Sequence, residues 1–209
     1  MKKIPDILDK AEWYRRGVEA GDVRPYVYVR PDNQIPNPGT MHRLDWFPEE
    51  PIIKNPLDTR ELDFAEQIYH IEHKAFGPAN MAMPRWVFYD CAIIPGFVAG
   101  IAMRTSKLPA NIAKVLRSDL NLEWTPLSLF IIIPTMKKGE WVAHNLCAVN
   151  SLLPESDRLY ALGFLSKAFG LWYANVETCC GVTQWTSPSV RLHSLFGHFE
   201  VLTAFTPIH

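Results

Sequence analysis

The spacing of apolar residues changes along this chain, from helical to extended and then to an alternation of the two. The clearest helical segment covers residues 62–76, where one face is formed by Phe64, Ile68, Ile71 and Ala75. These positions repeat at the three- and four-residue intervals of an amphipathic helix, and the Phe76-Gly77-Pro78 sequence is typical of a helix end. The pattern therefore predicts a helix over residues 62–76.

Extended apolar runs follow at residues 86–94, 97–104, 127–134 and 141–153. Pro95-Gly96 joins the first two runs, and a Lys-Lys-Gly-Glu turn at residues 137–140 joins the last two. Short connections between extended runs predict β-hairpins. Residues 107–120, between the two pairs, are predicted to be a helical insertion.

The pattern then alternates between helix and strand. We expect a helix over residues 159–173, a buried strand over 180–185, a helix over 190–196 and a final strand over 201–205. Such alternation predicts crossover connections and locally parallel strands. The fold class is therefore α/β (α+β): a mixed, mostly antiparallel central sheet flanked by helices.

Residues 1–56 differ from the rest, because they hold eight of the 17 prolines. A helix is predicted from apolar spacing at residues 7–18 with Gly21 at its end, followed by a short strand at 26–30 and a loop at 32–39. We interpret this segment as an N-terminal extension packed on a main domain of residues 57–209.

Composition narrows the classes of function. The 21 basic and 22 acidic residues give a net charge of -1 without a like-charge block, so neither a nucleic-acid nor a membrane partner is expected. The N-terminus lacks the apolar core of a signal peptide, and Asp90 and Pro95-Gly96 interrupt the longest apolar stretch. These features favour a cytoplasmic protein. The four cysteines, Cys91, Cys147, Cys179 and Cys180, are predicted to be free and mostly buried thiols.

The segment 149–165 carries the clearest chemical signal. A strand ends, Pro154 and a polar turn follow, and a helix begins with the small residues Ala161 and Gly163. Small residues let a ligand approach the backbone, and the free N–H groups and dipole of a helix start favour phosphate. The sequence Arg158-x-x-Ala161-x-Gly163 resembles the acyl-CoA signature of the GNAT superfamily of N-acyltransferases, which reads Arg or Gln, two residues, Gly, one residue, then Gly or Ala.

The resemblance extends in order over residues 60–209, with a first helix ending in an aromatic residue, three antiparallel strands and a late helix followed by Gly197-His198-Phe199. It implies an N-acyltransferase that uses acetyl-CoA or another acyl-CoA as substrate and a small amine or amino-acid-like molecule as acceptor. In the family, the pyrophosphate lies on the signature, which here is Arg158, Leu159, Tyr160, Ala161, Leu162 and Gly163. The acyl-pantetheine pairs with the fourth strand where it splays from the fifth, here at Cys147 and Val149 opposite Val182. Ala161 departs from the family's glycine.

The resemblance also suggests catalytic groups. His193 occupies the position of the family tyrosine that protonates the departing thiolate, and histidine can give a proton near neutral pH. His144 and Glu140 are the candidates for the base that deprotonates the amine, and Asn145 and Gln184 could orient substrate. Each of these residues also has a purely structural interpretation, as a hydrogen-bonded core or surface side chain.

Two other functions stay open. Because Ala161 and His193 depart from the family pattern, the chain could be a binding module for an acyl-CoA or another small molecule, without catalysis. A metal-dependent hydrolase built on Glu66, His70 and His73 is the weaker alternative, and we expect no metal. Cys179-Cys180 and the aromatic residues Phe169, Trp172, Tyr173 and Trp185 are interpreted as core, whereas Trp46-Phe47 could line a pocket. A homodimer is compatible with the sequence.

Overall fold

The computed structural model describes residues 4–34, 47, 50–90, 96–181, 183 and 189–196. In this part of the chain, seven strands form one sheet: β1 Val23–Tyr28, β2 Ile52–Lys54, β3 Phe97–Arg104, β4 Trp124–Pro126, β5 Ser128–Pro134, β6 Glu140–Ala148 and β7 Thr178–Gly181. The order across the sheet is β2-β1-β3-β5-β6-β7, and β4 pairs with β3. The pairs β1–β2 and β6–β7 are parallel and the others antiparallel, which confirms a mixed, mostly antiparallel sheet.

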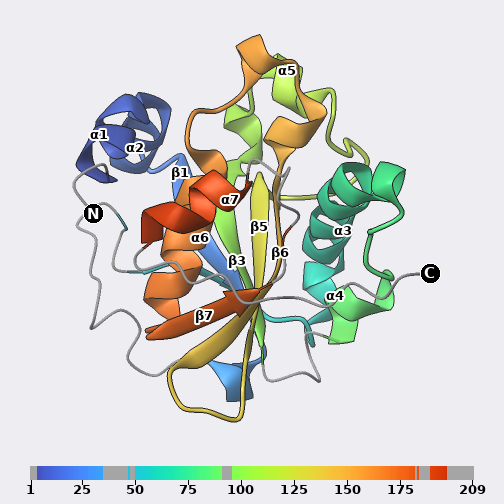
Figure 1. The fold of residues 1–209 in the computed structure, drawn as a ribbon. Helices are drawn as coiled ribbons and strands as arrows, with labels where there is room; N and C mark the ends of the chain where they lie inside the picture. Colours follow the sequence, from blue (N-terminus) through green and yellow to red (C-terminus); the bar gives the residue numbers. More distant parts are fainter. Residues whose placement is uncertain are drawn as a thin grey trace.

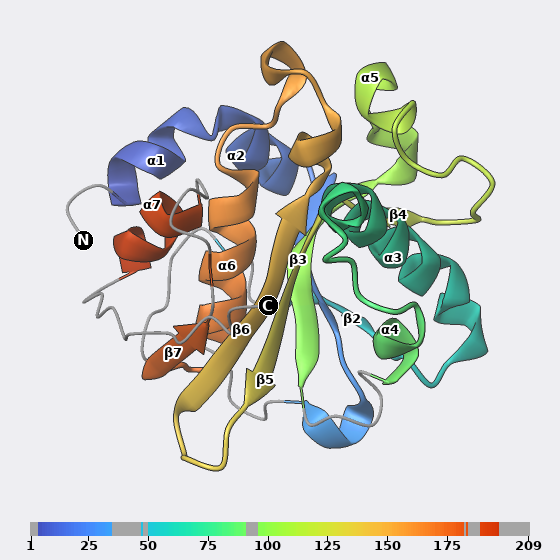
Figure 2. The same ribbon diagram turned by 45° about the vertical axis from the view of Figure 1, so that its right-hand side comes forward.

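The helices of the described residues are α1 Ile4–Lys10, α2 Glu12–Glu19, α3 Leu62–Phe76, α4 Trp86–Asp90, α5 Ala110–Ala113, α6 Leu162–Tyr173 and α7 Ser189–His193. They flank the sheet in two layers: α6 and α7 lie on one side, whereas α3 and α4 lie on the other (Figures 1 and 2). α2 lies beside the start of α6, where Trp13 reaches the turn that precedes this helix (Figure 2). None of these helices is long and apolar enough to cross a membrane.

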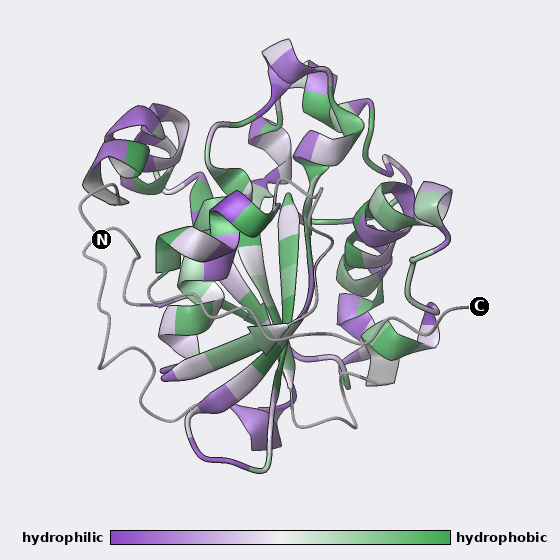
Figure 3. Ribbon diagram, in the orientation of Figure 1, coloured by the Kyte–Doolittle hydropathy of each residue, from purple (hydrophilic) through white to green (hydrophobic). Residues whose placement is uncertain are grey.

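The apolar side chains gather on the central strands and on the helix faces toward them (Figure 3). On the α6 side, close approach to β5 requires a glycine, because a Cβ on Gly170 would lie 2.6 Å from the Phe130 ring. On the α3 side, the rings of Phe64 and Tyr26 meet edge to face with centroids 4.9 Å apart. Both faces of the sheet are thus buried, which explains the nearly continuous apolar runs of β3 and β5.

Several sequence predictions are confirmed. α3 spans the predicted 62–76, and Phe64, Ile68 and Ile71 are fully buried. The β5–β6 hairpin turns at Gly139, whose φ of 77° lies in the left-handed region that glycine adopts without strain. The short helix predicted near 190–196 is seen as α7 followed by a 3-10 turn, Ser194–Phe196.

The strand predicted over 86–94 is wrong for residues 86–90, which form α4, and residues 91–95 lie outside the described part of the chain. A short apolar run does not distinguish a buried strand from one turn of helix by its periodicity. The insertion at 107–120 is also less helical than predicted. It contains only the single turn α5, which follows a 3-10 turn at Thr105–Lys107.

The strand predicted over 180–185 begins two residues earlier and is not buried, since all four residues of β7 are exposed. Consequently Cys179 and Cys180 are exposed thiols rather than core, and of the three cysteines that the structure describes only Cys147 is buried as predicted. The physical reason is that β7 is the last strand of the sheet order. Cys91, Gln184, Trp46, Trp185 and the predicted strand 201–205 lie outside the described residues.

Residues 1–56, expected to be an extension packed on a main domain, supply β1 and β2 to the central sheet. β1 pairs with β3 along its whole length, from Val23 opposite Met103 to Tyr28 opposite Val98. The Tyr26 hydroxyl also donates to the Ser128 carbonyl of β5 at 2.7 Å. Phe47 is buried against Phe169, with ring centroids 5.3 Å apart, so it belongs to the core.

Candidate functional site

Strand β6 runs past the end of its parallel partner β7. The two strands pair from Glu140 opposite Thr178 to Ala143 opposite Gly181, whereas β6 continues to Ala148. From His144 onward, this edge of β6 has no partner strand among the described residues. A gap between the two strands was predicted at Cys147 and Val182. The pairing ends just before that point, and Val182 itself lies outside the described residues.

A β-bulge lies at the same place on β6. The register with β5 passes from Ile132 opposite Ala143 to Phe130 opposite Leu146, so β6 has one extra residue within His144-Asn145. A bulge re-aims the side chains at which it occurs. Both side chains are thereby directed toward the α3 and α4 side of the sheet. There Asn145 contacts Glu72 and His144 lines a cavity.

His144 and Asn145 are joined to α3 by hydrogen bonds. The His144 Nδ1 lies 3.2 Å from the Asn145 Oδ1, and the Asn145 Nδ2 donates to the Glu72 Oε1 at 2.8 Å. A carboxamide oxygen only accepts hydrogen bonds, so neutral His144 carries its proton on Nδ1 and leaves the Nε2 lone pair free. His144 is exposed. This arrangement orients an accessible imidazole to take a proton.

Glu72 is fully buried, and its Oε1 also accepts from the Met83 N–H at 3.0 Å. Its Oε2 has no hydrogen-bond partner among the described residues. Burial raises the pKa of this carboxyl above its ordinary value, against smaller opposing effects of the Met83 and Asn145 hydrogen bonds. Glu72 is not among the site residues predicted from the sequence. A signal was present, because Glu72 lies four residues after Ile68, on the apolar face of the predicted helix.

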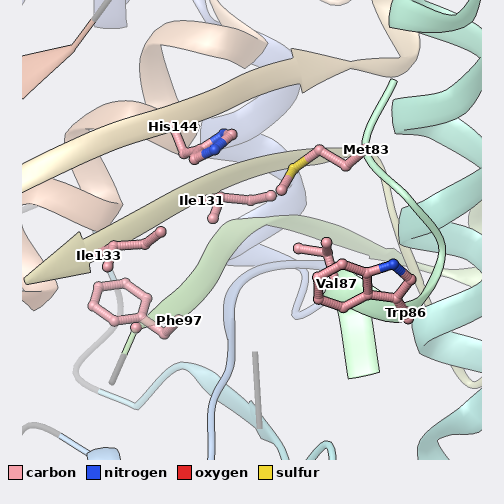
Figure 4. Close-up of a pocket in the computed structure, with 8 residues that line it drawn as sticks. Met83, Trp86, Val87, Phe97, Ile131, Ile133 and His144 are labelled. Carbon is pink, nitrogen blue, oxygen red and sulfur yellow. The ribbon is translucent and has the colours of Figure 1, made fainter. Parts of the chain in front are cut away.

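A cavity of about 200 Å³ lies between α4 and the strands beneath it. It is lined by Met83, Trp86, Val87, Gly96, Phe97, Ile131, Ile133 and His144. Figure 4 shows Met83, Trp86 and Val87 facing the strand residues across this space, with His144 at one end. His144 and the indole N–H of Trp86 are the polar side-chain groups of the lining.

The signature segment forms a fixed turn before α6. The Asn150 side chain accepts from the Leu159 N–H at 2.9 Å and donates to the Leu159 carbonyl at 2.7 Å. Ala161 adopts a left-handed conformation with φ 62°, so α6 begins at Leu162 instead of the predicted residue 159. The Trp13 indole of α2 donates to the Tyr160 carbonyl at 2.8 Å.

This turn leaves backbone donors free. The N–H groups of Tyr160, Ala161 and Gly163 have no acceptor among the described residues, whereas Leu162 makes only a long bond of 3.4 Å. Arg158 is exposed, with its Nε 3.2 Å from the Leu153 carbonyl. Free N–H groups at the start of a 12-residue helix, beside an exposed guanidinium, form a chemical environment that favours phosphate.

His193 lies over α6 and forms a hydrogen bond between its Nδ1 and the Nζ of Lys167. Lys167 is buried, and burial lowers its pKa to about 8. Burial, together with the nearby Lys167 charge, lowers the pKa of His193 to about 4. At neutral pH the imidazole is therefore uncharged and accepts the bond on Nδ1. Lys167 was not selected from the sequence, since it is a lone lysine in an apolar run.

The remaining candidates are placed differently. Cys147 is buried, and burial raises the pKa of its thiol well above the ordinary value. The Val149 N–H already donates to the Leu127 carbonyl at 2.7 Å. Glu140 lies at the opposite end of β6, roughly 20 Å from Cys147 at the rise of a strand. It accepts from the Thr135 hydroxyl at 3.0 Å, so the structure does not bring it together with His144.

The residues considered for a metal do not converge either. The His70 Nε2 lies 3.0 Å from the Val115 carbonyl. Glu66 accepts from Arg85 at 2.9 Å and from Arg117 at 3.0 Å. Within the described ranges, no group of three His, Cys, Asp or Glu side chains could hold a metal ion.

Comparisons with known proteins give little beyond this geometry. No family model matches the chain, and no curated protein matches it. Among solved structures, the chain is similar to one named "Putative acetyltransferase from Agrobacterium tumefaciens str. C58", with 14% identity and a TM-score of 0.42 over 69% of this chain and 95% of that one. A structural similarity at this level supports neither a family nor an activity for this chain.

Proposed function

We propose that the protein transfers an acyl group, with acetyl as the simplest case, from acyl-CoA to the nitrogen of a small amine. One observation carries the proposal. Among the described residues, the pairing of β6 with β7 ends at Ala143, and β6 ends beside a helix start with three N–H groups that have no acceptor there. A strand edge without a partner among the described residues, followed by a turn with free backbone donors, suits a long ligand with a pyrophosphate at one end. The order of elements in the sequence resemblance supports the same interpretation.

In this proposal the pyrophosphate binds the N–H groups of Tyr160, Ala161 and Gly163, with Arg158 at the rim. The pantetheine then follows the unpaired edge of β6 toward His144. Backbone N–H groups on that edge polarise the thioester carbonyl, because donors fixed in advance stabilise the charge that develops on oxygen. Holding the amine against the thioester supplies a further part of the rate.

The base is His144. Its Nε2 removes a proton from the amine as the nitrogen attacks the carbonyl carbon, and the C–N bond forms. Asn145 acts as a positioning residue, since its carboxamide fixes the tautomer of His144 and is itself fixed by Glu72. The C–S bond then breaks and leaves CoA as a thiolate.

The thiolate regains a proton from the pair of Lys167 and His193. His193 gives the proton of its Nε2 to sulfur and takes one from the Lys167 ammonium through Nδ1. An ammonium with a pKa of about 8 can supply this proton near neutral pH. This retains the role expected of His193, with Lys167 as the source of the proton.

The decisive experiment titrates acetyl-CoA into the protein by calorimetry, with two variants of Gly163. A Cβ at Gly163 meets only Leu192, at 4.0 Å, so a side chain fits there. The carboxylate of Gly163→Asp interacts favourably with the helix dipole but repels a pyrophosphate. Gly163→Asn introduces a side chain of the same shape without the charge. We expect Gly163→Asp to weaken binding by at least about tenfold relative to Gly163→Asn without loss of Tm. No heat and no thermal shift at millimolar acetyl-CoA would reject the proposal.

A binding module without catalysis is the second candidate. The observation that favours it is the low pKa of His193, because an uncharged imidazole at this position is a weaker acid than an imidazolium. Acetyl-CoA binding without release of CoA across a panel of primary amines would support this alternative. Release of CoA with any amine would exclude it.

A further inference from the structure

The cavity under α4 identifies the class of acceptor. Resting on the proposed transfer from acyl-CoA, we propose that the acceptor is a primary amine carried on a small apolar body, a single ring or a branched alkyl group. The body occupies the cavity, and the amine nitrogen lies at His144.

The lining sets the chemistry of the body. Met83, Trp86 and Val87 approach from the helix side, and Phe97, Ile131 and Ile133 from the strands (Figure 4). A hydroxyl, carboxylate or second ammonium placed against Phe97, Ile131 and Ile133 would lose its hydration without gaining a hydrogen bond, at a cost of about 1–3 kcal/mol or more. An amino acid or a polyamine is therefore disfavoured, and an apolar amine is favoured.

The volume sets the size of the body. A dry cavity of about 150 Å³ holds a benzene molecule, whereas drug-sized ligands occupy roughly 300–1,000 Å³. A cavity of about 200 Å³ thus accommodates one ring or a short branched chain. Trp86, which lines the cavity, is 58% exposed, so the cavity opens to solvent beside α4.

The position of His144 decides which substrate occupies the cavity. A base must lie within about 3 Å of the proton that it removes, and that proton belongs to the amine. His144 is the residue of the lining that can accept a proton, and it is the first residue of β6 beyond the paired segment. The acyl group needs N–H donors at its carbonyl instead of a base. The cavity is accordingly assigned to the acceptor and not to a long acyl chain.

The test measures CoA release from acetyl-CoA with phenylethylamine, 3-methylbutylamine, ethanolamine, glycinamide and putrescine. We expect kcat/KM for the first two to exceed that for the polar amines by at least about tenfold, since each methylene in an apolar pocket is worth roughly tenfold or more. Equal use of the polar amines, or a preference for hexanoyl-CoA over acetyl-CoA that disappears when the cavity is filled, would overturn the assignment. Acetyl-CoA binding is measured first, so that failure of the acyltransferase proposal itself is recognised separately.

Two variants change the cavity in opposite directions. Val87→Phe fills the cavity, and Ile133→Ala widens it. In Val87→Phe, the ratio of kcat/KM for phenylethylamine to kcat/KM for ethylamine should therefore fall about tenfold. In Ile133→Ala, kcat/KM should increase for amines with larger rings, such as naphthylmethylamine. Val18→Phe makes the same change as the first variant on α2, away from the cavity, and should leave the ratio unaltered. An unchanged ratio in both cavity variants would also overturn the assignment, and Tm values identify any variant that fails to fold.

Discussion

The Asn145 side chain donates a 2.8 Å hydrogen bond to the buried carboxyl of Glu72, and this contact joins the bulge of β6 to helix α3. The bulge disrupts the strand ladder at this point, so the side-chain contact stabilises a segment that the sheet alone would hold less well. The same carboxyl accepts from the Met83 N–H, which fixes the start of the segment that leads into α4. Glu72 therefore positions the imidazole and one wall of the cavity together.

Glu72→Gln should change how stability depends on pH. Burial raises the pKa of Glu72 above its ordinary value of 4.5, so the folded state keeps the proton while the unfolded state loses it. As pH rises through 4.5 and then through the folded pKa, the wild type loses stability at this site, because folding then requires a buried carboxylate. Glutamine accepts the same two hydrogen bonds but does not ionise.

Urea unfolding of both proteins between pH 4 and 8 measures this effect. The difference in free energy of unfolding, Glu72→Gln minus wild type, should increase with pH. A difference that is constant over this range would show that Glu72 does not ionise with an altered pKa. As a comparison, Glu72→Ala removes both hydrogen bonds as well as the charge and should be less stable than Glu72→Gln by about 1–3 kcal/mol at every pH.

His144→Gln should lower kcat by about 100-fold or more, the usual contribution of a general base. The affinity for acetyl-CoA should not change, because in the proposed mechanism the imidazole contacts the amine and not the nucleotide. Asn145→Ala leaves the imidazole in place but free to rotate, so kcat should fall by roughly tenfold with a shifted pH profile. His70→Gln is the matched control, since its ring lies beside the Val115 carbonyl, and kcat should be unaffected. Equal rates for His144→Gln and His70→Gln would exclude His144 as the base.

Ala161→Gly should stabilise the protein and tighten acyl-CoA binding. Ala161 has a φ of 62°, and a left-handed conformation costs a residue with a Cβ roughly 1–2 kcal/mol. Part of this gain is offset by the greater chain entropy of glycine, so we expect a net stabilisation of about 0.5–1 kcal/mol.

Ala174→Gly is the control for that substitution. It lies at the other end of α6 with φ −77°, an ordinary helical value, so the change should destabilise by about 0.5–1 kcal/mol. Chemical denaturation compares the two variants, and calorimetry with acetyl-CoA measures the affinity. The same sign of effect at both positions would contradict the strain assigned to Ala161.

The parts of the fold with strong local signals were predictable from sequence. α3 has a clear helical repeat, and the β5–β6 hairpin has Gly139 at its turn. α4 was missed because Trp86 to Phe88 read equally well as a strand, and its helical form depends on packing over the sheet. The exposure of Cys179 depends on the place of β7 at the sheet edge, which strand order decides and local sequence does not.

The candidate site was predictable only in part. His144 and the turn before Gly163 could be selected as candidates from the sequence, because a histidine in a strand and small residues at a helix start are visible locally. Glu72 and Lys167 were missed, since their importance comes from contacts made across the fold, with Asn145 and His193. A charged residue on an apolar helix face is the general signal that would have selected both.

Lys167→Met should stabilise the protein and impair catalysis at the same time. Burial lowers the pKa of Lys167 from 10.5 to about 8, which corresponds to a cost of charge burial on the order of 3 kcal/mol below pH 8. The unfolded state binds the proton more tightly than the folded state, so this cost is present in full below pH 8 and disappears as pH rises to 10.5. Methionine has a similar length and no charge.

We expect Lys167→Met to raise the free energy of unfolding at pH 7 by roughly 1–3 kcal/mol, since loss of the His193 hydrogen bond offsets part of the gain. The advantage over wild type should shrink as pH increases from 8 toward 10.5. In the same variant kcat should fall by about tenfold or more, because the thiolate then lacks its proton source. Lys138→Met removes an exposed lysine from the β5–β6 turn and should alter stability by no more than about 0.5 kcal/mol and leave kcat unchanged. A Lys167→Met protein that is more stable but equally active would separate the two roles, and it would assign the return of the proton to another group.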